Sequence, residues 1–329
     1  MARIALVHDI AGVAAVQAEI LRGAGHEVEQ IALPTYGASW RWPAKAFALP
    51  FRLAAYTPTV ARLRRGRYAV IHIHFLSQGI VGVLLGREFF VQAHGSDLHL
   101  NLNDPIYRWI TRFVLERARA VFYVTPNLRA HLDRYRSKLV YLPNPVAMPE
   151  ADEAPTEMKD VLIFTRLHPV KGADVIFPAV ERLSTMVRVT ALDYGPLAPD
   201  YITRYGRWVT FVKPMPHDAI AAFIREFDVV IGQMRQGVLG LMEIESLAAG
   251  RAVIAAVNRD LYADDPPPVV AASTPDEIVD AVRELRGDPR ELARLAEAGR
   301  LWVKRNHSYE RHLELLESTY FREKKTAPN

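Results

Sequence analysis

The sequence contains no cysteine, which excludes disulfides, thiolate catalysis and cysteine-ligated zinc. It also lacks any stretch that approaches the roughly 18 consecutive apolar residues of a membrane span. The first residues, MARIALVHDI, form a strand-like run without the layout of a signal peptide, so a cytosolic location is the expectation. Asparagine and glutamine are sparse and arginine far outnumbers lysine, a balance that hints at a thermophilic source.

Acidic residues are missing between Glu29 and Glu88, although the net charge of the whole chain is only +4. The basic residues of this stretch are Arg41, Lys45, Arg52, Arg62, Arg64, Arg65, Arg67 and Arg87. This asymmetry predicts a positive face on the N-terminal half of the protein.

Part of the acid-free stretch, SWRWPAKAFALPFRLAAYTP at residues 39–58, mixes aromatic side chains with cations. Such a mixture suits peripheral contact of residues 39–67 with the anionic inner face of a membrane, or with a lipid-linked acceptor. The alternative is an ordinary loop and helix packed on a sheet, with solvated arginines. Nucleic acid is less favoured as a partner, because the basic residues accompany no recognisable binding motif.

What the sequence does contain is an alternation of short apolar runs and helix-length amphipathic segments. The runs expected to form strands are 3–8, 27–33, 69–75, 88–93, 120–125, 138–143, 161–165, 187–192, 208–212, 228–232 and 252–257. Near-continuous apolar strands separated by helices, such as 104–118 and 127–135, predict doubly wound parallel α/β sheets of the Rossmann-like kind.

One segment, residues 144–160, interrupts this alternation because it is rich in proline and acidic residues. A chain of 329 residues is long enough for two domains. We therefore expect an N-terminal domain over 1–147 and a second domain over 148–307. After residues 264–272 the chain is expected to be helical, at 275–286, 288–304 and 308–322.

The loop that opens the second domain, FTRLHPVKGADVIFPAV at 164–180, carries two cations. Arg166 and Lys171 lie five residues apart after a strand, and Gly172 starts a helix. Cations beside a helix N-terminus suit a diphosphate, because arginine supplies a planar fork and lysine a point charge. The alternative is a solvated loop with ordinary surface cations.

A second loop, QGVLGLMEIESLAAG at 236–250, combines glycines with two carboxylates. Glycines such as Gly240 let the backbone approach a ligand, and the amides of Gly240, Leu241 and Met242 would then point toward a phosphate. Glu243 and Glu245 are two residues apart on a helix, so they cannot both face one ligand. Either one of them accepts hydroxyl hydrogen bonds from a ribose, or both are solvated acids of the first helical turn.

The first domain offers fewer candidates. His94, in VQAHGSDLHL at 91–100, could hydrogen-bond a sugar hydroxyl, although a lone histidine is more often structural. His72 and His74 share one face of a strand, and packing is favoured over metal binding for them because no third ligand lies at useful spacing. Gly12 would allow close approach of a substrate to the following helix, but the full dinucleotide fingerprint is missing. No metal site is expected.

Taken in order, these motifs resemble the retaining glycosyltransferases of family 4, the group 1 glycosyl transferases with the two-domain GT-B fold. The resemblance rests on HGSD (94–97), NPV (144–146), RLHPVKG (166–172) and GLMEIESLAAGRAVI (240–254). It implies transfer from a nucleotide-diphosphate sugar to a sugar or lipid-linked acceptor, with retention, without metal and without a further cofactor. It also implies that helix 308–322 crosses back to the first domain.

The resemblance implies a role for individual residues. Arg166 and Lys171 would hold the diphosphate and stabilise the leaving group, and Glu245 would bind the ribose. Gly240 and Leu241 would supply backbone contacts to phosphate, while His94 would contact the donor sugar.

One position departs from the family pattern, which has two glutamates separated by seven residues. Counting back from Glu245, the first of them falls on Gly237. Gln236 is adjacent and could replace it, as could Gln233. Two rival functions stay open on the sequence alone: a sugar-nucleotide epimerase of the same fold, and a non-catalytic module that binds a sugar nucleotide.

Overall fold

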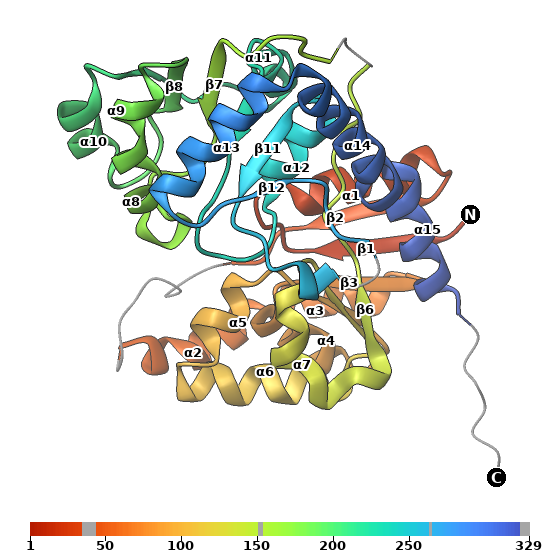
Figure 1. The fold of residues 1–329 in the computed structure, drawn as a ribbon. Helices are drawn as coiled ribbons and strands as arrows, with labels where there is room; N and C mark the ends of the chain where they lie inside the picture. Colours follow the sequence, from red (N-terminus) through yellow and green to blue (C-terminus); the bar gives the residue numbers. More distant parts are fainter. Residues whose placement is uncertain (35–43, 151–153, 263–264, 323–329) are drawn as a thin grey trace. The chain divides into compact units, whose positions relative to one another are not determined.

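A computed structural model describes residues 1–34, 44–150, 154–262 and 265–322 (Figure 1). The chain forms two compact units. Unit 1 contains Met1–Pro145 and the C-terminal residues from His312 onward, and unit 2 contains Val146–Arg311. None of the helices in the described residues is long and apolar enough to cross a membrane.

Unit 1 is built on six parallel strands in the order β2-β1-β3-β4-β5-β6. The strands are β1 (Arg3–Val7), β2 (Glu27–Ile31), β3 (Val70–His74), β4 (Phe90–Ala93), β5 (Ala120–Tyr123) and β6 (Leu139–Tyr141). Its helices are α1 (Val13–Gly23), α2 (Ala44–Ala55), α3 (Thr57–Arg65), α4 (Ile80–Leu85), α5 (Ser96–Asn101), α6 (Pro105–Arg117) and α7 (Arg129–Leu132), with most of α15 (Tyr309–Tyr320). The strand order changes direction between β1 and β3, which makes this the switch point of the sheet.

The unit 1 sheet is buried on both faces because successive side chains of a strand point to opposite sides. Ile4 and Leu6 of β1 join a cluster with residues of α1 and α15, whereas Ala5 and Val7 join one with residues of α3, α4 and α6. Leu316 of α15 is fully buried in the first cluster. The chain therefore returns to unit 1 along α15, which covers a face of the sheet.

Unit 2 repeats the parallel design with the strand order β12-β11-β10-β7-β8-β9. The strands are β7 (Asp160–Ile163), β8 (Arg188–Leu192), β9 (Val209–Val212), β10 (Val229–Ile231), β11 (Ala252–Ala255) and β12 (Val270–Ala271). The helices are α8 (Ala173–Ile176), α9 (Val180–Leu183), α10 (Ala198–Tyr205), α11 (Ile220–Ile224), α12 (Leu241–Ala248), α13 (Pro275–Gly287) and α14 (Pro289–His307). The chain runs from the central β7 outward to β9 and then returns to β10 on the other side of β7. The switch point of unit 2 thus lies between β7 and β10.

Local sequence explains where several helices begin. Asp104 precedes Pro105, and its side chain accepts hydrogen bonds from the first amides of α6. Thr274 and Glu277 form a capping box at α13, and Asp288 caps α14. Each of these helices has proline in its first turn, where the missing N–H costs nothing.

The expected pair of doubly wound sheets is confirmed, with a few differences in the elements. The short β12 was not predicted, because it is only two residues long and follows three prolines. The helix expected at 127–135 is instead a chain of short helical pieces, two of them 3-10 helices. Residues 39–43 of the basic aromatic segment lie outside the described residues.

Candidate functional site

Two loops leave the unit 2 sheet at its switch point. One follows β7 and contains Arg166 and Lys171, and the other follows β10 and runs to Gly240, where α12 begins. β7 and β10 are paired neighbours, and their connections leave in opposite directions, which opens space for a ligand at the carboxyl edge. The amide of Met234 donates to the carbonyl of Lys171 at 2.8 Å, so the main chain ties the loops together.

Lys171 lies beside the loop between β10 and α12, residues 232–240, which we call the glycine loop. Its Nζ donates to Oε1 of Gln236 at 2.6 Å, and a Cβ added at Gly240 would lie 3.6 Å from the same nitrogen. Gly172 has a φ of 78°, and a Cβ there would come within 2.8 Å of Met234. The close packing of the two loops therefore requires glycine at 172 and leaves the ammonium beside the start of α12.

Glu243 is a structural carboxylate. It is 2% exposed, and its Oε2 and Oε1 accept hydrogen bonds from the amides of Gly240 and Gln233 at 2.7 and 2.8 Å. Gly232 makes room for it, since a Cβ there would lie 2.6 Å from Oε1. The interpretation that both glutamates are solvated is therefore wrong for Glu243, which fixes the loop and caps α12.

Glu245 lies at a different position on α12. Its side chain is 15% exposed, and its Oε1 is 2.9 Å from Nε2 of His217, which is 78% exposed. Burial raises the pKa of Glu245, and the hydrogen bond and charge of His217 oppose that rise. A partner so exposed can be replaced by a ligand hydroxyl at little cost.

Arg166 is exposed, and its guanidinium lies 5.7 Å from the ring centre of Tyr194, which follows β8. Within the described chain, no acidic side chain forms an ion pair with Arg166, so its donors face solvent. No hydrogen bond among the described residues joins it to Lys171. Both cations thus lie at the same edge of the sheet, but their contacts differ: Arg166 lies near Tyr194 and Lys171 donates to Gln236.

Helix dipoles contribute less to this edge than the sequence suggested. The helix expected after Gly172 ends after four residues, because Pro178 lacks the amide a longer helix would need. The amide of Gly240, expected to face a phosphate, donates to Glu243 instead. Leu241 and Met242 supply the first amides of α12, which have no carbonyl acceptor within the helix.

Gln233 is fully buried and holds the glycine loop in shape. Its Nε2 donates to the carbonyls of Val238 and Ala256, and its Oε1 accepts from the amides of Arg235 and Gln236. With every side-chain atom used, it cannot replace the missing glutamate, and that expectation is wrong. Gln236 is exposed beside Lys171, and its replacement of the missing glutamate stays a prediction.

A cavity of about 500 Å³ lies beside the glycine loop, at the carboxyl ends of β10, β11 and β12. Gly237 and Asn258 contribute to its wall, and its charged wall residues already have partners. Arg235 pairs with Asp174, and Glu277 accepts hydrogen bonds at the start of α13. Its size suits a small molecule, and its place is the one where open α/β sheets bind ligands.

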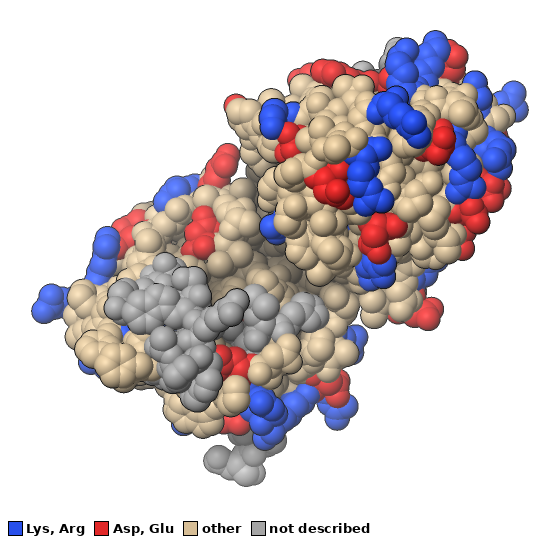
Figure 2. All heavy atoms as spheres, turned by 90° about the vertical axis from the view of Figure 1, so that its left-hand side faces the viewer, with Lys and Arg blue, Asp and Glu red and all other residues tan. Residues whose placement is uncertain are grey.

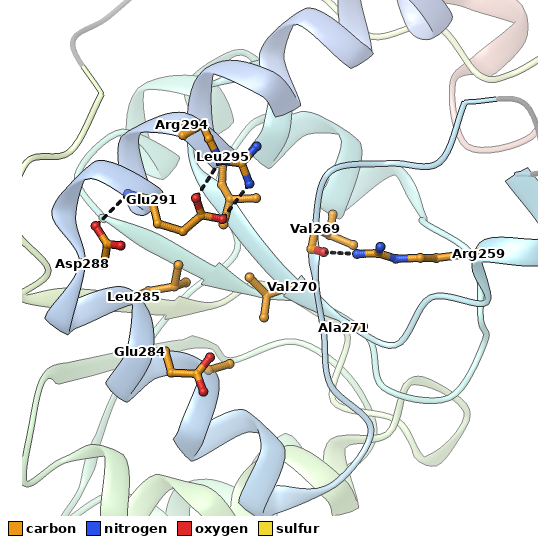
Figure 3. A pocket seen from close by; sticks show the side chains of 11 residues that line it. Arg259, Val269, Val270, Ala271, Glu284, Leu285, Asp288, Glu291, Arg294 and Leu295 are labelled. Carbon is orange, nitrogen blue, oxygen red and sulfur yellow. Dashed lines mark hydrogen bonds and ion pairs between the residues drawn. The ribbon is translucent and has the colours of Figure 1, made fainter.

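A second cavity of unit 2, of about 430 Å³, lies between β12, α13 and α14 (Figure 3). Three acids, Glu284, Asp288 and Glu291, outnumber the cations Arg259 and Arg294, and Glu291 forms an ion pair with Arg294 at 2.6 Å. A diphosphate would meet net negative charge here, so this cavity does not suit the group that Arg166 and Lys171 would hold.

In unit 1, His94 follows β4 at the carboxyl edge of the sheet. Its Nε2 lies 3.2 Å from Nδ1 of His74. Burial, assisted by the nearby His8, lowers the pKa of His94 to about 4. At neutral pH the imidazole is therefore uncharged and can exchange hydrogen bonds with a sugar without presenting a charge.

Asp97 of the HGSD motif is fully buried and joins two loops at the carboxyl edge of the unit 1 sheet. It accepts hydrogen bonds from the amides of Leu76, His94 and Leu98 at 3.0 to 3.1 Å. Burial raises the pKa of Asp97 to about 6, against the effect of these amides. The carboxylate thus ties the loop after β4 to the loop after β3.

His72 and His74 pack inside the unit, as the sequence favoured. Both are fully buried, their rings stack with centres 4.7 Å apart, and Nδ1 of His72 is 2.6 Å from the hydroxyl of Tyr320 on α15. Burial lowers the pKa of both far below the ordinary value. No cluster of metal-ligand residues occurs among the described residues.

Gly12 begins α1 with a φ of 78°, and nothing lies within 4 Å of where its Cβ would stand. The same loop holds His8 and Ala11 at positive φ, which is uncommon for residues other than glycine. The approach of a substrate to Gly12 stays a prediction, and the unusual backbone lies at the unit 1 switch point.

The arginines of the acid-free stretch are used in different ways. Arg62 forms an ion pair with Glu29 at 2.6 Å, Arg87 donates to the carbonyl of Tyr68, and Arg52 is buried. The expectation of solvated arginines is therefore wrong for Arg52. Figure 2 shows that basic and acidic side chains interleave on the visible face of unit 2. On α10, Arg204 forms an ion pair with Asp200.

Sequence reasoning missed two contacts that shape these edges. His217 contacts Glu245 from the 3-10 helix η6 (His217–Ala219), 28 residues away in sequence, and no sequence motif predicted this contact. His74 contacts His94 from the neighbouring strand, and here the His-x-His spacing did predict its inward direction. The second contact depends on the pairing of β3 with β4, and the first on the packing of η6 near α12, neither of which the motifs state.

Two family models match the chain. A glycosyl transferase 4-like domain matches residues 10–145, and a glycosyl transferase-like domain matches residues 179–318. Together they span most of both units. The chain therefore belongs to the GT-B glycosyltransferases, in the glycosyl transferase 4-like and group 1 families.

Individual relatives agree with this assignment. Alpha-D-kanosaminyltransferase of Streptomyces kanamyceticus is 27% identical over 285 residues, covering 72% of each chain. Sucrose-phosphate synthase from Thermosynechococcus elongatus superposes with a TM-score of 0.74 over 97% of this chain and 98% of its own, at 18% identity. Anabaena HepE in complex with UDP-glucose gives 0.71 over 97% and 99%, at 14% identity. At these identities the structural likeness establishes the fold.

Proposed function

We propose that this glycosyltransferase takes its sugar from a nucleoside diphosphate sugar bound at the switch point of unit 2. The observation that carries the proposal is the place of Lys171, whose ammonium stands beside Gly240 and the first turn of α12. A cation beside the free amides of Leu241 and Met242 attracts a phosphate by charge and by hydrogen bonds. A structural relative, HepE, has been solved with UDP-glucose, which favours a uridine nucleotide.

Arg166 would supply a second positive charge to the departing diphosphate. It is exposed on the same edge as Lys171 and has no acidic partner within the described residues. Two fixed cations can stabilise the negative charge that develops as the glycosidic bond breaks. We therefore propose that the reaction needs neither a metal ion nor a further cofactor, in line with the absence of an Asp-x-Asp motif from the sequence.

Glu245 is proposed to bind the ribose, and Gln236 the transferred sugar. The carboxylate of Glu245 is partly exposed and its present partner, His217, is a surface side chain. Gln236 stands next to Lys171 and one residue before Gly237, where the family pattern has a glutamate. His94 of unit 1, neutral at pH 7, is proposed to hydrogen-bond the donor sugar during transfer with retention.

A further part of the proposal concerns peripheral membrane contact through unit 1. Phe47 and Phe51 of α2 and Trp109 of α6 are exposed, and Arg108 and Arg112 are exposed beside Trp109. α2 and α6 lie side by side (Figure 1). Aromatic and basic side chains together suit an anionic bilayer surface. Flotation with anionic vesicles at low salt should carry the protein upward, and its absence from the floating fraction would end this part.

Thermal unfolding with a panel of nucleoside diphosphate sugars tests the donor proposal. A ligand at 100 times its Kd stabilises the folded protein by about 2.7 kcal/mol, so the right donor should raise the melting temperature visibly. The reaction is then followed by proton NMR, where retention appears as the donor's own anomeric configuration in the product. A panel without any stabilising nucleotide would contradict the donor site, and an inverted product would contradict retention.

A further inference from the structure

Arg52 of unit 1 is a buried cation that no acidic side chain neutralises within the described residues. It is 6% exposed, and its Nε and Nη1 donate to the hydroxyls of Tyr56 and Tyr107 at 2.9 and 2.8 Å. The third nitrogen, Nη2, has no partner among the described residues.

The partners of Arg52 are unusual for a buried charge. A buried guanidinium is normally paired with a carboxylate, because tyrosine hydroxyls are neutral and do not compensate its charge. Arg251 of unit 2, which is 4% exposed, is different: it donates to the main-chain carbonyls of Gly250 and Arg225 and fastens the backbone there. Within the described residues, Arg52 donates to no main-chain carbonyl, and both of its partners are hydroxyls.

The surroundings place Arg52 at the switch point of the unit 1 sheet. The hydroxyl of Tyr56 donates to Oε1 of Gln78 at 2.6 Å, and Gln78 lies in the 3-10 helix η1 (Leu76–Gly79) that follows β3. His8 follows β1, the neighbour of β3 across the switch point. Burial lowers the pKa of His8; the charge of Asp9 opposes this shift and the charge of Arg52 adds to it.

Asp97, the buried acid of this edge, does not neutralise Arg52. Its oxygens accept from the amides of Leu76, His94 and Leu98, and it forms no ion pair with Arg52. Asp9 is exposed and caps α1 through the amide of Ala14. Among the described residues, the positive charge is therefore held by hydroxyls without an acidic partner, near the place where an open α/β sheet binds its ligand.

We propose that Arg52 binds an oxyanion, a phosphate or a carboxylate, carried by the acceptor of the transfer reaction. The planar guanidinium matches both groups, and a bound oxyanion would supply the charge that the tyrosines lack. The inference rests on the proposed function only in naming the anionic molecule as the acceptor. The site itself belongs to unit 1, whereas the proposed donor site belongs to unit 2.

Calorimetric titration of the full chain tests the site without donor. The protein carries Arg166→Ala and Lys171→Ala, so the cations of unit 2 cannot bind the probe. At constant ionic strength we expect glucose 6-phosphate, glucuronate or both to bind more tightly than glucose. The anionic probe that binds identifies the group as phosphate or carboxylate. Equal binding of all three sugars, or binding of none, would overturn the proposal.

Variants then locate the binding. Arg52→Gln should weaken the anionic probe about ten- to hundredfold, as expected for a lost hydrogen bond to a charged group. Arg65→Gln removes the same charge from exposed α3 and should change affinity less than about twofold. Arg52→Lys keeps the charge and the stem but loses the fork, so it covers the case in which Arg52→Gln does not fold, and should bind several-fold more weakly. Wild-type affinity in the folded Arg52 variants would overturn the proposal.

This experiment is independent of the donor. If the wild-type chain binds no nucleoside diphosphate but the anionic sugar binds through Arg52, the proposed donor site fails and the oxyanion site stands. If donors bind and the Arg52 variants keep wild-type affinity for the anion, the oxyanion site fails and the proposed donor site stands.

Discussion

The two sheets share a parallel, doubly wound design, yet their switch points carry different chemistry. In unit 2 the edge holds a partly exposed lysine, an exposed arginine and the start of α12. In unit 1 the edge holds His94, with a pKa near 4, and the buried carboxyl of Asp97, with a pKa near 6. One topology thus supports an edge with exposed cations in unit 2. In unit 1, burial keeps His94 uncharged at neutral pH, while the buried guanidinium of Arg52 has no acidic partner among the described residues.

The largest expected effect is on the unit 2 edge. Lys171→Ala and Arg166→Ala should each lower kcat about 10²- to 10³-fold, because each removes a fixed charge that the proposed function places beside the leaving diphosphate. Steady-state kinetics with the donor found by thermal unfolding measures this.

Lys159→Ala is the matched control for these two substitutions. Lys159 is exposed at the opposite end of the sheet and pairs with Glu157, so its loss should leave kcat unchanged. Unchanged kinetics in both edge variants would remove the electrostatic role assigned to this edge.

The next effect separates the two edges by pH. The pKa of His94 is about 4 in the folded chain and near 6.5 when unfolded, so the unfolded state binds more protons between these values. Stability is therefore highest above pH 6.5 and falls as the pH drops toward 4. His72 and His74 act in the same direction. Asp97 has a raised pKa and acts in the opposite direction below pH 6.

Hydrogen exchange between pH 7 and 4 should show unit 1 losing protection before unit 2, where Glu245 has a raised pKa and favours the folded state on acidification. His94→Gln should reduce the pH dependence of unit 1 stability by about 3 kcal/mol. Asp97→Asn should steepen the dependence in the same window. Unit 2 opening first would contradict this account of the unit 1 histidines.

The smallest effect tests the division of labour between the two glutamates of α12. Glu243→Ala leaves the buried amide of Gln233 and the part-buried amide of Gly240 without an acceptor and should destabilise unit 2 by about 2 kcal/mol. Glu245→Ala should cost well under 1 kcal/mol, since its partner is a surface histidine, but should weaken nucleotide binding. Chemical denaturation and nucleotide titration distinguish them, and interchanged effects would reverse the assignment.

The sequence predicted the elements more completely than the contacts between them. Apolar runs predicted each long strand of both sheets, because a parallel strand buried on both faces needs an apolar side chain at nearly every position. The exception, β12, is too short for a periodic signal. The motifs also predicted that Arg166, Lys171 and α12 would lie on one edge of the second sheet, since loops after parallel strands share an edge.

Other features followed only from the tertiary structure. Nothing in the spacing of Glu243 and Glu245 tells which one is buried. That depends on Gly232 lying beneath Glu243 and on the amides within its reach. Likewise, nothing in the sequence distinguishes Arg52 from the other cations of the acid-free stretch. Its burial follows from the packing of α2 against Tyr107 of α6.

By itself, then, the sequence determined two doubly wound sheets and the loops that carry glycines and cations at their edges, because hydrophobic periodicity and turn chemistry are local properties. The tertiary structure decided which charges are buried, which carboxylate is already used and which cation lacks a counter-charge among the described residues. Those outcomes depend on neighbours from distant parts of the chain, and desolvation by such neighbours sets the cost of each charge.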